Sequence, residues 1–431
     1  MAELDCGVDS LGIDGVGPSE GPIPSEYVAL VVQKFGGTSV GDADRIKAVA
    51  EHIVRTRRRG EDVVVVVSAM GKSTDELVRL AAEMNPNPPG RELDMLLSSG
   101  ERISMSLLCM ALAALDQPAV SLTGSQAGIV TDSSHTKAKI LEVKGDRIRE
   151  ALAEGAVAVV AGFQGMSIQK DITTLGRGGS DATAVALAAA LGASCCEIYT
   201  DVTGVFTADP RVVPDARRRD RLSFDEMLEM SATGGRVLML RSVEFARNYG
   251  VPIHVRSSFT WEPGTWVTEE DEHMEQAIIS GVTHDTSEAK VTVSGVPDQP
   301  GVAATLFRAF ADREVNVDMI VQNTGADGLT DISFTMPRDD VAMSELFVRE
   351  VARTVGSAGV TVDAGIARVS LVGAGMKSNP GVAATMFETL RDQGINIEMI
   401  STSTIRISVI VREDHCEDAV RALHAAFELS A

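Results

Sequence analysis

The sequence predicts an α/β protein, in which an αβα sandwich with a mainly parallel sheet precedes two smaller ferredoxin-like βαββαβ units. Two observations lead to this prediction. From Val28 to about Ser258, apolar runs typical of strands buried on both faces alternate with stretches of helical spacing. After this region one pattern of residues occurs twice, and because two copies are too few for a solenoid, they are expected to pack as a pair.

Length and composition limit the class of protein. A chain of 431 residues is too long for one compact core and predicts two or three domains. The formal net charge of −22 argues against a nucleic-acid or anionic-membrane partner, and no apolar run approaches the roughly 20 residues of a membrane span. The five cysteines show no CxxC pair and no metal-ligand spacing, which is typical of reduced thiols in a cytoplasmic protein.

The N-terminal segment differs from the rest of the chain. Residues 1–27 contain no Lys or Arg, several acidic residues, and many Gly, Pro and Ser. This composition argues against a secretory or organellar signal and predicts a disordered tail. The domains predicted after it span residues 28–260, 275–355 and 360–431.

Apolar runs predict the strands of the parallel sheet. They are Ala29–Val32, Asp62–Val67, Val157–Val160 and Glu197–Thr200. Helical spacing predicts helices around Ile46–Ile53, Asp94–Leu115 and Ala182–Leu191. Because ligands of such sheets bind beyond the carboxyl ends of the strands, chemistry is expected in the residues that follow each strand.

The run Lys34-Phe35-Gly36-Gly37-Thr38-Ser39 ends the first predicted strand and precedes a predicted helix. The glycines allow backbone N–H groups to approach a ligand, and a helix N-terminus together with Lys34 favours an anion there. In a Walker A loop the lysine follows the glycines, whereas here it precedes them, so a different kind of phosphate site is implied. For these six residues alone, an ordinary turn with a solvated lysine is an equally good interpretation.

A second glycine-rich helix start is Gly176-Arg177-Gly178-Gly179-Ser180-Asp181, which opens an Ala-rich helix. Ser180 or Asp181 is expected to cap this helix, and Arg177 supplies its own positive charge. A plain capped turn is the alternative. Two such sites in one parallel sheet predict a ligand, or a pair of reacting ligands, that is negatively charged at both ends.

Other polar residues follow strands or open helices in the same region. They are Ser68, Thr74, Glu101, Thr200, Asp201, Phe206, Arg211 and Arg236. Each could be ordinary loop or surface chemistry, and for Glu101 alone a surface charge on a helix is the simpler interpretation. The basic run Arg217–Arg219 is interpreted as a solvated surface feature.

The C-terminal part contains the repeat. Asp298-Gln299-Pro300-Gly301 recurs as Ser378-Asn379-Pro380-Gly381, and Asn316-Val317-Asp318-Met319 recurs as Asn396-Ile397-Glu398-Met399 at the same offset. Val372-Gly373-Ala374-Gly375 is similar to the start of a dinucleotide-binding GxGxxG motif, but Ser378 stands at the third glycine position. The repeat explains this segment better, so a fused dehydrogenase is not expected.

These motifs resemble the aspartate kinases of the amino acid kinase superfamily from about Val28 to the C-terminus. They are KFGGTSVGDADRI, SAMGKSTDEL, SSGERIS, TGSQAGI, GFQG, TTLGRGGSDATA and YTDVTGVFTADPRVV, in the same order. KFGGTS together with GRGGSD is the specific combination. The chain is most similar to the monofunctional bacterial type that lysine and threonine regulate, and its repeat resembles paired ACT domains, which hold an amino acid at their interface.

The resemblance implies a reaction and its cofactors. ATP, with Mg²⁺ on its phosphates and no all-protein metal site, would phosphorylate the side-chain carboxylate of L-aspartate to give 4-phospho-L-aspartate. This is the first step toward lysine, threonine and methionine. No general base is needed, because the attacking carboxylate is already ionised at pH 7.

The resemblance also implies roles for individual residues. Lys34 is expected to contact the transferring phosphoryl group, Asp181 to orient Lys34, and Arg177 to bind the carboxylate of aspartate. The other implied substrate-side residues are Ser68, Thr74, Glu101 and Ser180. The implied nucleotide-side residues are Gly36, Gly37, Ser39, Thr200, Asp201, Phe206, Arg211 and Arg236. Phe206 and Arg236 stand where the family commonly has tyrosine and lysine, which predicts altered nucleotide affinity.

Regulation and assembly are expected in the C-terminal half. The positions that match effector-binding residues of the family are Asp298, Gln322, Asn396 and Ile397. A short loop after Asn323, and Thr404 where glutamate is common, suggest weakened feedback inhibition by lysine and threonine. A homo-oligomer, dimer or tetramer, is expected through ACT pairing, and Met274 is a candidate internal start for a separately translated regulatory subunit.

Two alternatives remain at this point. The first is another amino acid kinase that acts on glutamate, acetylglutamate or a nucleotide, which the tandem repeat disfavours. The second is a catalytically inactive amino-acid sensor, which the intact charged glycine loops disfavour.

Overall fold

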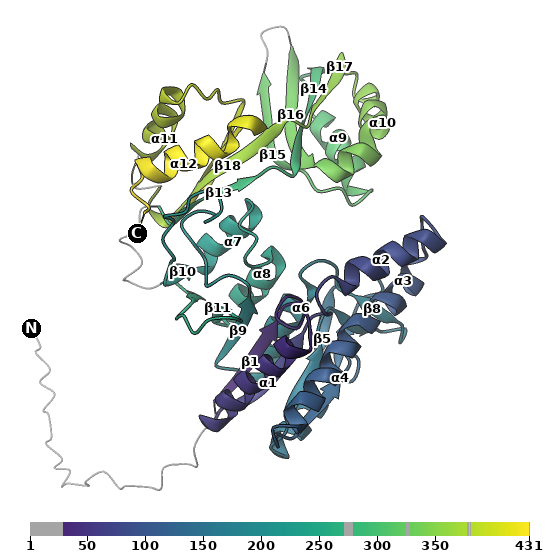
Figure 1. Ribbon diagram of the computed structural model, residues 1–431. Coiled ribbons are helices and arrows are strands. Elements are labelled where there is room, and N and C mark those ends of the chain that lie inside the picture. The colour runs from purple at the N-terminus through teal and green to yellow at the C-terminus, as the bar shows by residue number, and fades with distance from the viewer. Residues whose placement is uncertain (1–28, 271–278, 325–327, 377–378, 380, 431) are drawn as a thin grey trace, which may run out of the picture.

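The computed structural model describes residues 29–270, 279–324, 328–376, 379 and 381–430. They form an N-terminal α/β domain, purple to teal in Figure 1, and a C-terminal half with two further sheets, green to yellow (Figure 1). The predicted tail of residues 1–27 and the candidate start Met274 lie outside the described residues.

The N-terminal domain is built on an eight-stranded, mainly parallel sheet. In order across the sheet its strands are β10 (Arg221–Ser223), β12 (Thr265–Thr268), β11 (Ile253–Ser257), β9 (Cys195–Thr200), β1 (Leu30–Phe35), β2 (Asp62–Val67), β6 (Val157–Ala161) and β3 (Ala119–Leu122). All neighbouring pairs are parallel except β11 with β12. The predicted parallel sheet is therefore confirmed.

Helices cover both faces of this sheet, which confirms the predicted αβα sandwich. On one face lie α1 (Ala43–Arg58) and α4 (Ser99–Ala113). On the other lie α5 (Asp146–Ala153), α6 (Gly179–Leu191), α7 (Phe224–Ala232) and α8 (Leu240–Tyr249). The strand β2 shows why, since Val63, Val65 and Val67 point to the first face and Val64 and Val66 to the second.

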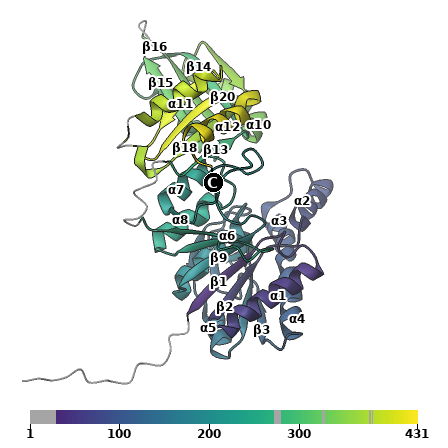
Figure 2. The same cartoon turned by 60° about the vertical axis from the view of Figure 1, so that its left-hand side comes forward.

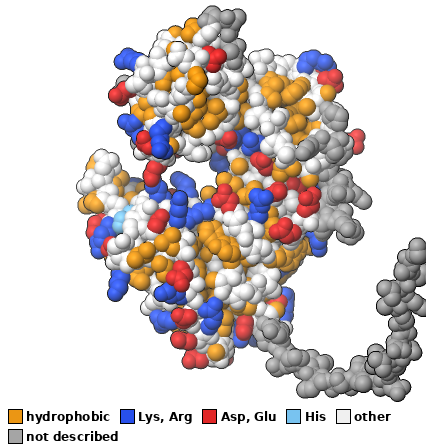
Figure 3. All heavy atoms as spheres, turned by 180° about the vertical axis from the view of Figure 1, so that it is seen from behind, with side chains coloured by type: hydrophobic (Ala, Val, Ile, Leu, Met, Phe, Trp, Pro, Cys, Tyr) orange, Lys and Arg blue, Asp and Glu red, His pale blue; other side chains and the backbone are white. Residues whose placement is uncertain are grey.

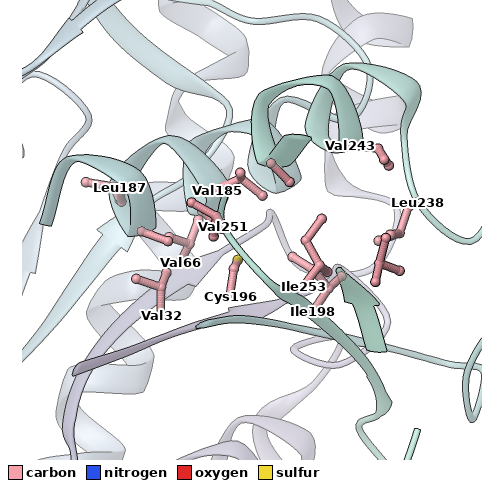
Figure 4. Close-up of a cluster of buried hydrophobic side chains, with 14 of the residues drawn as sticks. Val32, Val66, Val185, Leu187, Cys196, Ile198, Leu238, Val243, Val251 and Ile253 are labelled. Carbon is pink, nitrogen blue, oxygen red and sulfur yellow. The ribbon is translucent and has the colours of Figure 1, made fainter. Parts of the chain in front are cut away.

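The core on the α6 face consists of branched and small side chains from several strands (Figure 4). Val32, Val66 and Cys196 come from three neighbouring strands and pack under Val185 of α6. Nearly every residue of α6 is buried, because helices and strands surround it on all sides. This burial fixes the position of the loop that precedes α6.

A small four-stranded sheet lies beside the main one. Its order is β5 (Ile140–Val143), β4 (Ile129–Thr131), β7 (Gln164–Ser167) and β8 (Ile172–Thr174). The helix α3 (Gly90–Leu97) packs on β8, and α2 (Ser73–Met84) packs on α3. β8 leads directly into the loop of Arg177.

The stretch Gly90–Ala113 is, among the described residues, long and apolar enough by length and composition to cross a membrane. The structure instead divides it at Ser98 into α3 and α4, where a single predicted helix covered Asp94–Leu115. α4 packs on the main sheet, and the stretch carries the buried carboxylates Asp94 and Glu101. These are the features of helices in a folded α/β domain.

The C-terminal half contains two modules. The first module has the predicted βαββαβ order, with β14 (Glu288–Pro297), α9 (Val302–Ala311), β15 (Asp318–Thr324), β16 (Leu329–Pro337), α10 (Arg338–Thr354) and β17 (Gly359–Asp363). The second module has β18 (Ile366–Val372), η2 (Ala374–Met376), α11 (Gly381–Asp392), β19 (Met399–Thr402), β20 (Arg406–Arg412), η3 (Glu413–His415) and α12 (Cys416–Ala426). The two modules lie side by side in Figure 1, and both views show them above the N-terminal domain (Figures 1 and 2).

One strand crosses the predicted boundary between the modules. β13 (Gly281–Asp285) falls within residues 275–355, which were predicted as the first unit, but it pairs with β18 in the second module's sheet. It thereby completes a four-stranded sheet that the second copy alone cannot form. The second module is consequently discontinuous in sequence, and the first module is inserted between its strand β13 and its strand β18.

Candidate active site

Four adjacent parallel strands, β9, β1, β2 and β6, end at one edge of the main sheet, and their loops form the candidate site. The loops are tied together by backbone hydrogen bonds. Gly36 N donates to Tyr199 O over 3.3 Å, and Gly71 N donates to Gly37 O over 3.0 Å. The predicted glycine-rich turn therefore lies at the centre of this edge.

The two predicted charged loops meet through an ion pair. Lys34 Nζ lies 2.6 Å from Asp181 Oδ1, and these side chains are only 12% and 9% exposed. Lys34 extends from the end of β1, and Asp181 lies in the first turn of α6. Arg177 lies four residues before Asp181, in the turn that precedes α6, and is exposed, so both predicted cations lie at the same edge of the sheet.

The start of α6 differs from the prediction. Its N-cap is Gly178, at φ 71°, and no side chain caps the helix. The expectation that Ser180 or Asp181 would cap it is wrong, because both lie inside the first turn and Asp181 pairs with Lys34. In this first turn Gly179 N and Asp181 N donate to Gly176 O (3.0 Å) and Gly178 O (3.1 Å), so among the described hydrogen bonds Ser180 N is the amide that remains for an anionic ligand.

The start of α1 also differs. The helix begins at Ala43, well beyond the glycine pair, and Asp42 caps it by accepting a hydrogen bond from Arg45 N (2.9 Å). A carboxylate therefore already occupies this helix N-terminus. In the turn at residues 36–40, Gly36 N, Ser39 N and Val40 N already donate to backbone carbonyls, so Lys34 and the amides of Gly37 and Thr38 are the groups that remain for an anion.

Ser39 has a partner that the sequence did not indicate. Its side chain is buried, and its Oγ lies 2.5 Å from Ser258 Oγ. Ser258 N in turn donates to Thr200 O over 2.8 Å, which links the loop after β1 to the loops after β9 and β11. Ser258 follows β11, far away in sequence, so only the sheet order reveals the contact.

Glu101, predicted as a substrate-side residue, is buried in α4 beside the end of β2. It is 2% exposed, and its Oε1 accepts a hydrogen bond from Ala69 N (3.2 Å), directly after Ser68. Its Oε2 has no hydrogen-bond partner among the described residues. Burial raises the pKa of Glu101 to about 7. A buried carboxylate oxygen without a partner is suited to binding a cationic group of a ligand.

Ser68, Thr74 and Ser180 lie around the same strand ends. Ser68 follows β2 and is half-buried, Thr74 opens α2, and Ser180 is buried in the first turn of α6. A Cβ at Gly162 would approach Ser180 Oγ to 2.8 Å, so the loop after β6 needs glycine to pack there. The predicted substrate-side residues thus come from the end of β2, the loop after β8, the first turns of α2 and α6, and α4.

On the opposite side of Lys34, the end of β9 and the loop after it carry four predicted residues, Thr200, Asp201, Phe206 and Arg211. Thr200 Oγ1 donates to Asp201 Oδ1 over 3.1 Å, and Phe206 forms an isolated β-bridge with Arg218. The next residue, Thr207, accepts a hydrogen bond at its carbonyl from Val282 N of β13 (2.7 Å). This loop is therefore attached directly to the C-terminal half.

Arg211 and Arg236 extend furthest into solvent. Arg211 is 87% exposed in its side chain and pairs with Asp209 at 2.6 Å, and this hydrogen bond lowers the pKa of Asp209. Arg236 is 75% exposed and lies 3.9 Å from Asp285 of β13. Neither arginine contacts Lys34 in any described interaction, so they border the site rather than form its centre.

The predicted effector residues all lie in the two modules. Asp298, Gln322 and Asn396 are exposed, whereas Ile397 packs against the core of the second module. Thr404 is exposed after β19. The shortened loop after Asn323 includes residues 325–327, which lie outside the described residues.

The two halves of the molecule enclose a hollow, and Lys and Arg side chains gather around it in the view from behind (Figure 3). One ion pair, Lys137 with Glu314, joins the N-terminal domain to the first module. A separate cavity of about 350 Å³ lies at the amino ends of the strands, lined by Arg59, Glu197 and Trp266 among others. It contains none of the predicted site residues.

Comparison with known proteins gives the family of the chain. The amino acid kinase family profile matches residues 29–257, and two ACT domain profiles match residues 291–356 and 369–427. An aspartokinase of Mycolicibacterium smegmatis is 58% identical over 407 residues, covering 93% of this chain and 97% of that protein. The chain belongs to the aspartokinase family.

Solved aspartokinase structures share the fold. E. coli aspartokinase III in complex with aspartate and ADP, in its R-state, has a TM-score of 0.80 at 26% identity and covers 92% of this chain and 99% of that one. The same enzyme with lysine and aspartate, in its T-state, has a TM-score of 0.73 at 26% identity with the same coverage. The aspartokinase fold thus includes the N-terminal kinase domain and both ACT modules.

Proposed function

We propose that this chain transfers the terminal phosphoryl group of ATP to the side-chain carboxylate of L-aspartate, giving 4-phospho-L-aspartate. The observation that supports this best is the ion pair of Lys34 with Asp181, which joins the two glycine-rich loops at one edge of the sheet. A related enzyme of the same fold binds aspartate and ADP together. A catalytically inactive amino-acid sensor, the alternative considered above, would not need this buried ion pair.

The geometry supports a division of the site into two sides. Lys34 and the amides of the first glycine loop neutralise the transferring phosphoryl group, and Asp181 holds Lys34 in place. Arg177 binds a carboxylate of aspartate, and Glu101 receives its α-ammonium. The aspartate side chain attacks without a general base, because it is ionised at pH 7. Positioning and charge neutralisation account for catalysis.

Mg²⁺ is proposed to bind on the nucleotide phosphates. Among the described residues no group of three or more His, Cys, Asp or Glu side chains could hold a metal ion, and Asp181 is engaged by Lys34. This donor set fits an ion held mainly by phosphate oxygens. Bound there, Mg²⁺ supplies charge neutralisation of the phosphates.

Two substitutions test the proposed function. Lys34→Ala and Arg177→Ala are each expected to abolish acyl phosphate formation, measured by trapping the product with hydroxylamine. Lys47→Ala is a suitable control, because Lys47 is an exposed lysine of α1 that pairs only with Asp44 in the described interactions. Near-wild-type hydroxamate formation in either active-site variant refutes the role given to that residue.

We also propose that the ACT modules bind lysine or threonine, and that feedback inhibition of the kinase by these amino acids is weakened. The residues proposed to bind them are Asp298, Gln322, Asn396 and Ile397. The related E. coli enzyme binds lysine in its T-state, which supports an amino-acid effector. Assays with both amino acids test the weakening, and strong inhibition at sub-millimolar concentration refutes it. We also propose that the chain forms a homo-oligomer through its ACT modules. A separately translated regulatory subunit is part of the same proposal, and detection of a single full-length product in the native host would refute that subunit.

A further inference from the structure

We propose that Asp94 is a positioning residue for the substrate side of the site, whose carboxylate holds the loop that carries Arg177. This rests on the function proposed above. Asp94 belongs to α3 and is fully buried. The sequence does not indicate a role for Asp94, because its hydrogen-bond partners are all distant in sequence.

The carboxylate of Asp94 joins three segments of the chain. It accepts a hydrogen bond from Thr174 Oγ1 at the end of β8 (2.5 Å) and another from Thr136 N (3.0 Å). His135 Nδ1 lies 2.6 Å from its second oxygen. A buried carboxylate is retained only when such partners compensate for its loss of water, and here they lie on β8 and in the turn between β4 and β5, whereas Asp94 itself lies on α3.

The turn that Asp94 binds is strained. Thr136 has a φ of 66°, and a β-branched residue in the left-handed region costs roughly 1–2 kcal/mol. Such a conformation persists only where the surroundings hold it. The Thr136 N–H group is within hydrogen-bond distance of both Asp94 oxygens, which supplies that hold.

The strained turn contacts the loop of Arg177 directly. A Cβ on Gly176 would lie 3.2 Å from Thr136 O, and Gly176 itself has a φ of 77°, so the two backbones pack closely. Arg241 reinforces the contact from α8 by donating to Leu175 O and to Ala138 O, each over 2.9 Å. Asp94 thus fixes Thr174 and the turn that packs on Gly176, and both of these residues lie just before Arg177 in its loop.

Asp94 acts through Arg177 and does not contact the substrate, because it has no exposed surface. A guanidinium must lie within hydrogen-bond reach of a carboxylate in the correct orientation, and a displacement of about 1 Å can cost up to about 100-fold in rate. Loosening the loop is therefore expected to weaken aspartate binding while leaving nucleotide binding largely unchanged.

The kinetic test uses Thr174→Val, which removes one hydrogen bond to Asp94 at nearly constant shape. We expect the aspartate KM to rise about tenfold with the ATP KM within about twofold, as loss of a hydrogen bond to a charged group implies. Thr173→Val is the matched control, since Thr173 is the adjacent residue of β8, is equally buried, and its hydroxyl pairs instead with Thr131 Oγ1 (2.6 Å). An equal effect of the two variants, or an equal rise of both KM values, overturns the proposal.

A second measurement is independent of turnover. Amide hydrogen exchange of the substrate-free full-length protein is expected to accelerate in residues 174–179 of Thr174→Val and Asp94→Asn but not of Thr173→Val. Unchanged exchange in that segment overturns the positioning role. If the wild-type protein does not phosphorylate aspartate, the proposed function fails, whereas the exchange experiment still decides whether Asp94 holds the loop.

Discussion

Glu101 carries a charge that the fold disfavours until a cation lies beside it. Burial raises its pKa to about 7, from the usual 4.5. Between these pH values the folded protein holds the proton and the unfolded chain releases it, so the free energy of unfolding falls as pH rises through this window. Above pH 7 the buried carboxylate costs about 3 kcal/mol in the absence of ligand.

Glu101→Gln is accordingly expected to stabilise the ligand-free protein at pH 8 by about 1–3 kcal/mol, and to change its stability little at pH 4.5. The same variant should raise the aspartate KM at pH 8 by about tenfold or more, because the amide does not neutralise the α-ammonium. Urea unfolding at both pH values and steady-state kinetics measure the two effects. A stability gain of equal size at both pH values contradicts the pKa, and an unchanged aspartate KM contradicts the role.

At the scale of single residues, the sequence located the charged centre but not its surroundings. Lys34 and Asp181 stand out because each lies in a glycine-rich motif, and the structure places them in contact. The burial of Glu101 depends on how α4 packs against Ala69, and a surface charge was the simpler interpretation from sequence. The partners of Asp94 and Ser258 lie in other elements, so no local pattern could indicate them.

The first glycine loop shows how an element limits its own substitutions. A Cβ on Gly37 would lie 2.9 Å from Ala69 O and 3.1 Å from Gly71 O, which are backbone atoms of the neighbouring loop. A Cβ on Gly41, in the same loop, would meet its nearest atoms only at 3.4 Å or more. Close packing against the neighbouring loop therefore requires glycine at position 37, whereas the space around Gly41 would accept a Cβ.

Gly37→Ala is expected to reduce kcat about 100-fold, because the loop must move away from the end of β2 and displace the amides beside Lys34. Gly41→Ala should change kcat by less than about threefold, since an ordinary contact replaces open space. Steady-state kinetics of both variants make the comparison. Similar activity in the two variants would show that close packing of the loops does not position the site.

At the scale of elements, strands were more predictable than helix ends. The predicted run Asp62–Val67, with valines at residues 63–67, matches β2, because burial on both faces leaves a clear pattern. Helix starts were predicted less well: Asp42 caps α1 beyond the glycine pair, and Gly178 begins α6 without a side-chain cap. Cap identity depends on local backbone angles and on competing partners such as Lys34, which sequence does not specify.

One buried arginine joins the three parts of the molecule. Arg368 of the second module pairs with Asp318 (2.5 Å) and Glu288 (2.9 Å) of the first, and donates to Ala232 O of α7 (2.8 Å). Asp318 corresponds to Glu398 in the other copy of the repeat, and Glu398 pairs with Lys290 of the first module. Each module therefore supplies a cation that pairs with a carboxylate of the other module. Of these two cations, Arg368 alone also contacts the kinase domain in the described interactions.

Arg368→Met is expected to destabilise the protein by roughly 3–5 kcal/mol, because it leaves Glu288, whose side chain is only 12% exposed, without its charge partner. Arg412→Met is the control: its side chain is 44% exposed and pairs with Asp363 and Glu398 at the surface, so a much smaller loss is expected. Urea unfolding followed by circular dichroism measures both. Equal losses would mean that Arg368 contributes no more than a surface ion pair.

The whole-molecule arrangement was only partly predictable. The repeat indicated two modules, and the first has the predicted order of elements. The exchange of β13 into the second sheet has no signal in the repeat, because residues 281–285 precede its first copy and their pairing is decided by long-range strand contacts. The attachment of the loop after β9 to β13, through Thr207, follows from the same exchange.

The account depends most on Lys34 and Arg177 serving one reaction at one edge of the sheet. A crystal structure of the full-length protein with ADP, Mg²⁺ and L-aspartate tests this most directly. We expect Lys34 Nζ within hydrogen-bond distance of a phosphate oxygen, the Arg177 guanidinium on a carboxylate of aspartate, and the side-chain carboxylate facing the terminal phosphate. Aspartate bound away from Arg177, or a nucleotide whose phosphates do not reach Lys34, would contradict it.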